Sequence, residues 1–171
     1  MFSLPPTPTL DGLHPLVVHF PIGVLFVAPL FLLLAMVLWK QRMTMLATSA
    51  TLLVLGTAAV LVTVASGQAA GELADRSPQI NPVLERHGEL AETVRTSFVG
   101  LTLLLLGMVA AALWLKDRIK RPVWIGAVAG YLVVYFGGLL LLANTAHQGG
   151  RLVQEFGVRA IMDAPAADVK H

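Results

Sequence analysis

Histidine is the residue type in this sequence with the clearest capacity for chemistry. The 171-residue chain has five histidines and no cysteine. Neutral imidazole binds zinc, copper and haem iron. The lack of cysteine excludes disulfides, thiolate metal sites, iron–sulfur clusters and the Cys-x-x-Cys-His attachment of covalent haem. The candidate ligands are His14, His19, His87 and His147, whereas His171 ends the chain and is set aside.

Four long stretches without charge must position these histidines. Hydrophobic residues make up 56% of the chain and charged residues 13%, against about 25% charged in a soluble domain. Each stretch reaches the roughly 20 residues that cross a hydrocarbon layer about 30 Å thick. We predict an all-α integral membrane four-helix bundle that forms a single domain, 1–171. Its spans are expected at about 16–39, 43–68, 93–116 and 122–147, with a loop at 69–92 and a tail at 148–171.

Two sequence features refine these boundaries, and the charges orient the spans. Pro82 is placed to start an extension of the third span, and Gly149-Gly150 to close the fourth. The two short links, Lys40–Arg42 and Lys116–Arg121, hold six basic residues and one acidic residue, whereas the long connection from Glu72 to Arg95 holds three basic and five acidic. The positive-inside rule then places the short links in the cytoplasm and both termini on the outer, periplasmic side.

The remaining basic and aromatic residues agree with this topology. The three tryptophans fall at the expected cytoplasmic edge, as in an aromatic belt; they are Trp39, Trp114 and Trp124. The net charge of +2 comes from residues beside the spans, so we expect a lipid bilayer and no nucleic acid as the partner.

All four candidate histidines fall at the outer end of the expected bundle. Two histidines from different helices can hold a haem between them, and the core of a four-helix bundle offers facing positions. Haem b, bound without covalent attachment, is the haem type that suits a chain without cysteine. Two pairings are open, His19 with His147 and, nearer the surface, His14 with His87. Cations in the outer segments that could neutralise haem propionates are Arg86, Arg95 and Arg151.

Other interpretations of these residues stay open. Each histidine could be purely structural. A zinc or copper site is an alternative to haem, although His14 and His19 lie five residues apart and do not share one face of an ideal helix. Glutamates near His87 could complete a metal site, or could form a solvated helix face; they are Glu85, Glu89 and Glu92. No Glu-x-x-His pair exists, so the di-iron signature of helical bundles is missing.

Two motifs resemble those of the DUF2231 family of prokaryotic membrane proteins. The first is the opening His-Pro-Leu-Val-Val-His-Phe-Pro-Ile-Gly at 14–23, and the second is His-Gln-Gly-Gly-Arg-Leu-Val at 147–153. The resemblance extends to Gly67, His87 and Phe156-Gly157-Val158, and covers roughly residues 12–159. It implies a multi-pass protein of the prokaryotic inner membrane. Relatives occur fused to or beside c-type cytochrome domains, which implies membrane redox chemistry and haem binding. Gln154-Glu155 departs from the family, in which Tyr-x-His is usual.

These observations favour a membrane b-type haem protein that relays electrons at the outer face of the membrane. Its electron partner would be a periplasmic carrier, a quinone or another subunit. The alternatives are a non-catalytic accessory subunit of a larger respiratory or photosynthetic complex, and an outer-facing zinc or copper site. An accessory role is suggested by Gly126-x-x-x-Gly130, which indicates either helix packing within the bundle or a contact face for a partner. An electron-transfer or accessory subunit is favoured over a stand-alone enzyme, and the sequence does not decide whether the chain is an enzyme.

Overall fold

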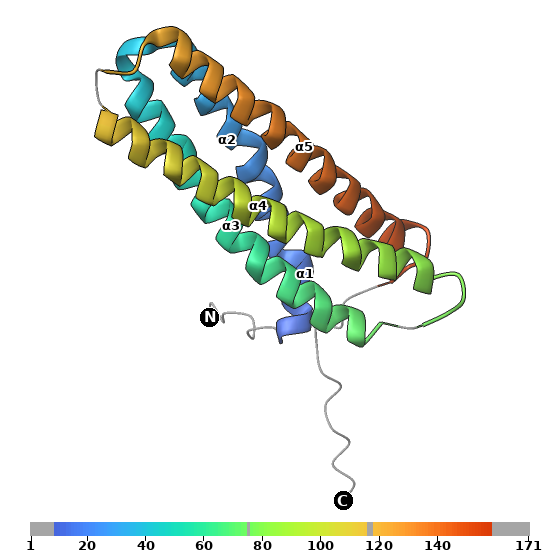
Figure 1. The fold of residues 1–171 in the computed structure, drawn as a ribbon. Helices are drawn as coiled ribbons and strands as arrows, with labels where there is room; N and C mark the ends of the chain where they lie inside the picture. Colours follow the sequence, from blue (N-terminus) through green and yellow to red (C-terminus); the bar gives the residue numbers. More distant parts are fainter. Residues whose placement is uncertain (1–8, 75, 116–117, 159–171) are drawn as a thin grey trace, which may run out of the picture.

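The described part of the chain consists of helices that form an elongated bundle (Figure 1). The computed structural model describes residues 9–74, 76–115 and 118–158, and contains no strand within these ranges. In chain order the elements are α1 (Leu10–Val17), α2 (His19–Val37), the short 3-10 helix η1 (Trp39–Gln41), α3 (Arg42–Glu72), α4 (Asn81–Leu115) and α5 (Arg121–Gln154).

Four helical segments are long and apolar enough to cross a membrane. These are α1 together with α2, η1 together with α3, α4, and α5. A helix satisfies its backbone hydrogen bonds internally, which any segment in hydrocarbon requires. The predicted all-α bundle with four membrane helices is therefore confirmed, and the chain is a multi-pass membrane protein.

The helices extend beyond the apolar cores that the sequence marks. The segment expected as a loop at 69–92 is largely helical, because α3 continues to Glu72 and α4 begins at Asn81. Pro82 lies in the first turn of α4, as expected. The prediction that Gly149-Gly150 closes the fourth span is wrong, since α5 runs through both glycines to Gln154. Residues 159–171 of the expected tail lie outside the described residues.

Contacts between consecutive helices, together with a contact between α2 and α5, close the four segments into a ring. The backbones of α2 and α3 approach closely at Gly56, where a Cβ atom would lie 2.6 Å from Leu25 Cδ2. Gly138 serves the same purpose between α5 and α4, since its Cβ would lie 3.0 Å from Leu101 Cδ1. By contrast, Gly126 and Gly130 are exposed and have no other side chain beside them. That pair therefore lies on the outward face of α5 and not in a helix contact of the bundle.

Buried hydroxyl groups join the helices in the apolar interior. The Tyr135 hydroxyl donates to the Leu25 carbonyl at 2.7 Å. This carbonyl needs an external donor, because the residue four positions later is Pro29, which has no N–H. The hydroxyls of Thr57 and Thr102 lie 2.7 Å apart and join α3 to α4. These hydrogen bonds fix the rotation of each helix and hence the direction of its remaining side chains.

Histidines lie at one end of the bundle, and Trp39 and Trp124 lie at the other. We call the end that contains α1, the link between α3 and α4, and the end of α5 the histidine end. At the opposite end, the Trp39 and Trp124 rings pack edge to face, with centroids 6.4 Å apart. The Trp124 indole N–H donates to the Ala35 carbonyl at 3.3 Å, and the Arg42 guanidinium lies 4.1 Å from the Trp39 ring centre.

Candidate functional site

His14 is held against α3 by a hydrogen bond to the backbone. Helix α1 packs on α3, and the Nδ1 atom of His14 lies 3.0 Å from the carbonyl oxygen of Thr63. A carbonyl only accepts hydrogen bonds, so Nδ1 of the neutral ring carries the proton and donates it. Nε2 then keeps its lone pair and is the ring atom available to a ligand.

His87 makes the corresponding interaction in the other half of the bundle. It projects from α4, and its Nδ1 atom lies 3.0 Å from the carbonyl oxygen of Thr145 on α5. The same argument leaves Nε2 of His87 with its lone pair. A backbone carbonyl that holds the far nitrogen is the usual way in which proteins orient a histidine that ligates a metal.

A glycine makes room for each imidazole. Gly67 and Gly149 each lie four residues after the threonine whose carbonyl is used, at the place where the ring rests on the helix. A Cβ atom on Gly67 would lie 2.8 Å from Cε1 of His14, and one on Gly149 would lie 3.0 Å from Cε1 of His87. At Gly67 the ring would have to shift, and at Gly149 it would have to give by a few tenths of an ångström, so glycine suits this ring placement at both positions.

The two halves of the chain therefore repeat one arrangement. In each half, a histidine donates to the carbonyl of the first residue of a Thr-x-x-x-Gly sequence on the following membrane segment, from α1 to α3 and from α4 to α5. The two sequences are Thr-Val-Ala-Ser-Gly at 63–67 and Thr-Ala-His-Gln-Gly at 145–149. The spacing of threonine and glycine is visible in the sequence, but only the packing of the helices connects it with His14 and His87.

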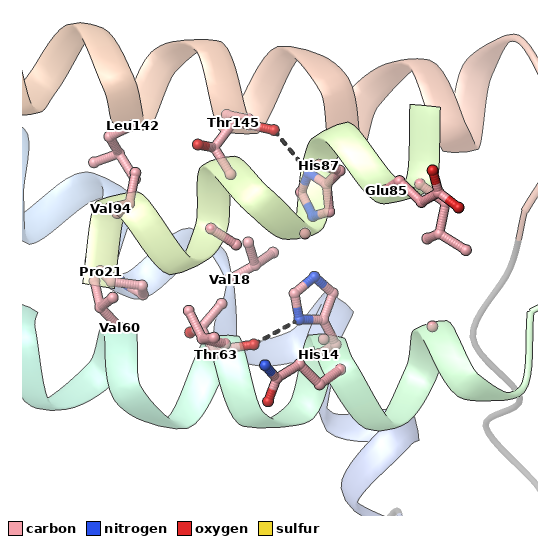
Figure 2. Close-up of a pocket in the computed structure, with 18 of the residues that line it drawn as sticks. His14, Val18, Pro21, Val60, Thr63, Glu85, His87, Val94, Leu142 and Thr145 are labelled. Carbon is pink, nitrogen blue, oxygen red and sulfur yellow. Dashed lines mark hydrogen bonds between the residues drawn. The ribbon is translucent and has the colours of Figure 1, made fainter. Parts of the chain in front are cut away.

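The two imidazoles face each other across a cavity at the histidine end. Figure 2 shows the ring edges that are not bound to carbonyls pointing toward one another. The cavity has a volume of about 550 Å³, within the range of about 300–1,000 Å³ for small-molecule and cofactor sites. Its walls are mainly aliphatic and small side chains, among them Val18, Pro21, Val60, Val94 and Leu142.

Several polar groups also line this cavity. Arg76, in the link after α3, lies at the cavity and donates to the Gly71 carbonyl at 3.3 Å. Two carboxylates, Glu72 and Glu85, lie at the same cavity. The hydroxyl of Thr63 is buried and has no hydrogen-bond partner. A buried hydroxyl of this kind costs about 1–3 kcal/mol when left unpaired, so it suits a cavity that receives a polar ligand atom.

The structure brings His14 and His87 together and leaves the other candidate ligands outside the cavity. His19 begins α2 and His147 lies on α5, and both side chains are exposed. Neither of them lines the cavity. Of the two pairings considered, only His14 with His87 faces a common space. His171 lies outside the described residues.

The predicted cations also lie elsewhere. Arg86 pairs with Glu89 at 3.2 Å, and Arg151 pairs with Glu155 at 3.0 Å. Arg95 pairs with Glu92 on its own helix. None of the three arginines lines the cavity. Among the described residues, the arginine that lines the cavity is Arg76. In the sequence this residue informs only the topology, because its link has no periodicity that would place it.

A multi-ligand metal site is not assembled in the described residues. No group of three or more histidine, aspartate or glutamate side chains converges there on a point that could hold a metal ion. Glu85 lies at the cavity, whereas Glu89 and Glu92 are engaged in ion pairs on the surface of α4. Among the described residues, the cavity therefore offers two opposed imidazoles that are not joined by a third side chain into a metal-binding group.

Fold and site together define a four-helix membrane protein with a two-histidine cavity at one end. The chain belongs to the family described as "Predicted membrane protein (DUF2231)", whose family model matches residues 10–161. This confirms the family that the histidine motifs indicated. No match was found among curated proteins or among solved structures.

Proposed function

We propose that this protein binds one haem b between His14 and His87 and takes part in electron transfer in the membrane. The observation that carries the proposal is the opposed pair of imidazoles, each anchored through Nδ1 to a backbone carbonyl with Nε2 directed into one cavity. Histidine is a common protein ligand of haem iron, so His14 and His87 would be the two residues that hold the group. A bound haem supplies one-electron chemistry.

The residues around the histidines support haem over a bare metal ion. Zinc sites use three or four protein ligands, and the described residues contain no such group. The aliphatic walls suit a flat apolar macrocycle, and the small residues Gly67, Gly88 and Ala91 widen the space. Arg76 is placed to pair with a carboxylate of the cofactor, while Thr63 offers an unpaired hydroxyl.

The distribution of charge supports an outward-facing site. Five basic residues of the two short links lie within the described ranges, at the end of the bundle opposite the histidine cavity; they are Lys40, Arg42, Arg118, Lys120 and Arg121. By the positive-inside rule, this arrangement favours a histidine end on the periplasmic side of a prokaryotic inner membrane. A cavity confined to one end does not reach across about 30 Å of hydrocarbon. The electron partner in this proposal is therefore a separate component, such as a periplasmic carrier, a membrane quinone or another subunit of a complex.

A reduced-minus-oxidised visible spectrum of the purified full-length protein tests the proposal. We expect a Soret band, a sharp reduced α band and one iron per chain. His14→Ala and His87→Ala should each lose most of the bound haem. His19→Ala and His147→Ala are the matched controls, since both residues are exposed and lie outside the cavity. A colourless protein that does not take up added haem would refute the proposal, as would a full Soret band in the double variant His14→Ala/His87→Ala.

A further inference from the structure

Basic side chains from two distant links gather at the end of the bundle opposite the histidine cavity. The turn from α2 to α3 and the link that leads into α5 lie side by side at this end (Figure 1). Four of the five described cations are exposed, and Arg42 is partly buried. We call this surface the basic corner; it consists of Lys40, Arg42, Arg118, Lys120 and Arg121.

One indole ring brings the two arginines at the centre of this surface together. The Arg42 guanidinium lies 4.1 Å from the centre of the Trp39 ring, and the Arg121 guanidinium lies 5.9 Å from the same centre. The Trp39 ring is itself held by its edge-to-face contact with Trp124. Guanidinium groups stack on aromatic faces, so the ring keeps two like charges near one point, where an anion can meet both.

The cations of the two links outnumber their carboxylates. The links contain six basic residues and one acidic residue, Asp117, so one ion pair leaves five positive charges in excess. Asp117 lies outside the described residues. The neighbouring helices supply no further carboxylate, because the sequence contains no aspartate or glutamate between Gly12 and Gly71 or between Arg118 and Gly150. The basic corner therefore offers its charge to an anion from outside the chain.

Exposed apolar side chains adjoin these cations on the membrane side. Val37 precedes Trp39 by two residues and is 71% exposed, and Val123 follows Arg121 by two residues and is 63% exposed. Tryptophan is typical of the interface between membrane and water, where the headgroups of phospholipids lie. A ligand with a charged head and apolar chains covers both surfaces, whereas a soluble anion would cover only the cations.

The cations also favour one kind of headgroup. Arginine binds a phosphate through paired hydrogen bonds. The headgroups of phosphatidylcholine and phosphatidylethanolamine carry a cation of their own, which the basic corner would repel. Phosphatidylglycerol has a phosphate and no such cation.

We infer that the basic corner binds the headgroup of an anionic phospholipid. Its phosphate lies beside the Arg42 and Arg121 guanidinium groups, and its acyl chains lie along the exposed surfaces of α2 and α5. Basic pockets between membrane helices are known to hold anionic lipid headgroups in this way. The inference goes beyond the proposed function and does not depend on haem.

Binding of phosphatidylglycerol to the full-length protein in detergent, measured by native mass spectrometry, tests the inference. We expect saturable binding of one lipid per chain, at least tenfold tighter than binding of phosphatidylcholine with the same acyl chains. Lys120→Gln/Arg121→Gln should weaken it at least tenfold, since each cation near an anionic lipid surface contributes about fivefold. Arg86→Gln/Arg151→Gln removes the same charge at the histidine end and is the matched control, which should bind as the wild type does.

Trp39→Leu separates a built site from an effect of net charge. This variant keeps every cation but removes the ring on which Arg42 and Arg121 lie. It should weaken binding of phosphatidylglycerol at least threefold. The unfolding temperature shows whether the bundle is intact, and the double variant Lys120→Gln/Arg121→Gln, which changes exposed positions only, tests the inference if Trp39→Leu does not fold.

Four results would overturn the inference. One is equal binding of phosphatidylglycerol and phosphatidylcholine to the wild type. Another is an equal loss of binding in the two double variants, because net charge would then explain the effect. A third is a folded Trp39→Leu variant that binds as the wild type does. The last is inorganic phosphate that displaces the lipid at a similar concentration, which would show a site for a soluble anion without a contribution from the acyl chains.

Discussion

Gly67→Ala is expected to displace His14 and weaken ligand binding in the cavity, although it adds a single methyl group. The new Cβ would lie 2.8 Å from Cε1 and 3.0 Å from Nδ1 of His14, whereas ordinary contact begins near 3.4 Å. The ring must therefore withdraw by about 0.6 Å, the difference between 2.8 and 3.4 Å. Because Thr63 lies on the same helix as Gly67, this withdrawal lengthens the 3.0 Å hydrogen bond to Thr63 by up to the same amount, to at most about 3.6 Å, which is beyond hydrogen-bonding distance.

The magnitude of the effect follows from that lost hydrogen bond. A typical hydrogen bond contributes about 0.5–1.5 kcal/mol, and loss of the group that orients a metal-binding histidine lowers affinity by about 10–100-fold. We expect the haem affinity of Gly67→Ala to fall about tenfold, measured by titrating haem into the apoprotein and following the Soret band. Because the two halves repeat the arrangement, Gly149→Ala should act in the same way through His87.

The control for this experiment is Gly130→Ala. Both substitutions replace glycine by alanine inside a helix, which by itself favours the helix by about 1 kcal/mol. At Gly130 a Cβ meets nothing within 4 Å, so this variant should bind haem as the wild type does. If Gly67→Ala also matched the wild type, and if nitrogen-15 spectra showed an unchanged Nδ1–H tautomer for His14, the reasoning on the glycine would be refuted.

Two further predictions concern groups outside the histidine pair. Tyr135→Phe removes the donor to the Leu25 carbonyl and should lower the free energy of unfolding in detergent by about 1–3 kcal/mol. In a Pro29→Ala background, in which the helix regains its own N–H donor, the same change should cost clearly less; equal costs in both backgrounds would contradict this account. Arg76→Gln removes the cation at the cavity and should lower haem affinity by up to about fivefold, as expected for an exposed ion pair worth about 1 kcal/mol or less, with a larger effect at low salt. Arg86→Gln, which breaks only the surface pair with Glu89, should leave the affinity unchanged, and an equal loss in both variants would show that the effect is one of net charge.

The sequence alone determined the class of fold. Apolar stretches of about 20 residues or more form helices in a bilayer, because in a helix the backbone groups form their hydrogen bonds within the same segment. Four such stretches with short or polar links therefore predict four membrane helices. Helix ends were less predictable, since Gly149 and Gly150 carry the usual signal for a terminus and yet lie inside α5. The hydrogen bonds within a helix tolerate glycine, and the His87 ring packs closely against one of the two, Gly149.

The sequence also indicated the candidate ligands, because residue counts along the spans place four histidines at one end. It could not decide which histidines face each other, since helix rotation depends on packing between segments that are distant in the chain. Three features of the tertiary structure make His14 and His87 face each other: the contact of α1 with α3, the register of α4 against α5, and the two backbone carbonyls that hold the imidazoles. Tertiary structure likewise placed Arg76 at the cavity and left His19 and His147 exposed outside it. The length of an apolar stretch depends only on consecutive residues, whereas the direction in which a side chain points depends on how the helices pack together.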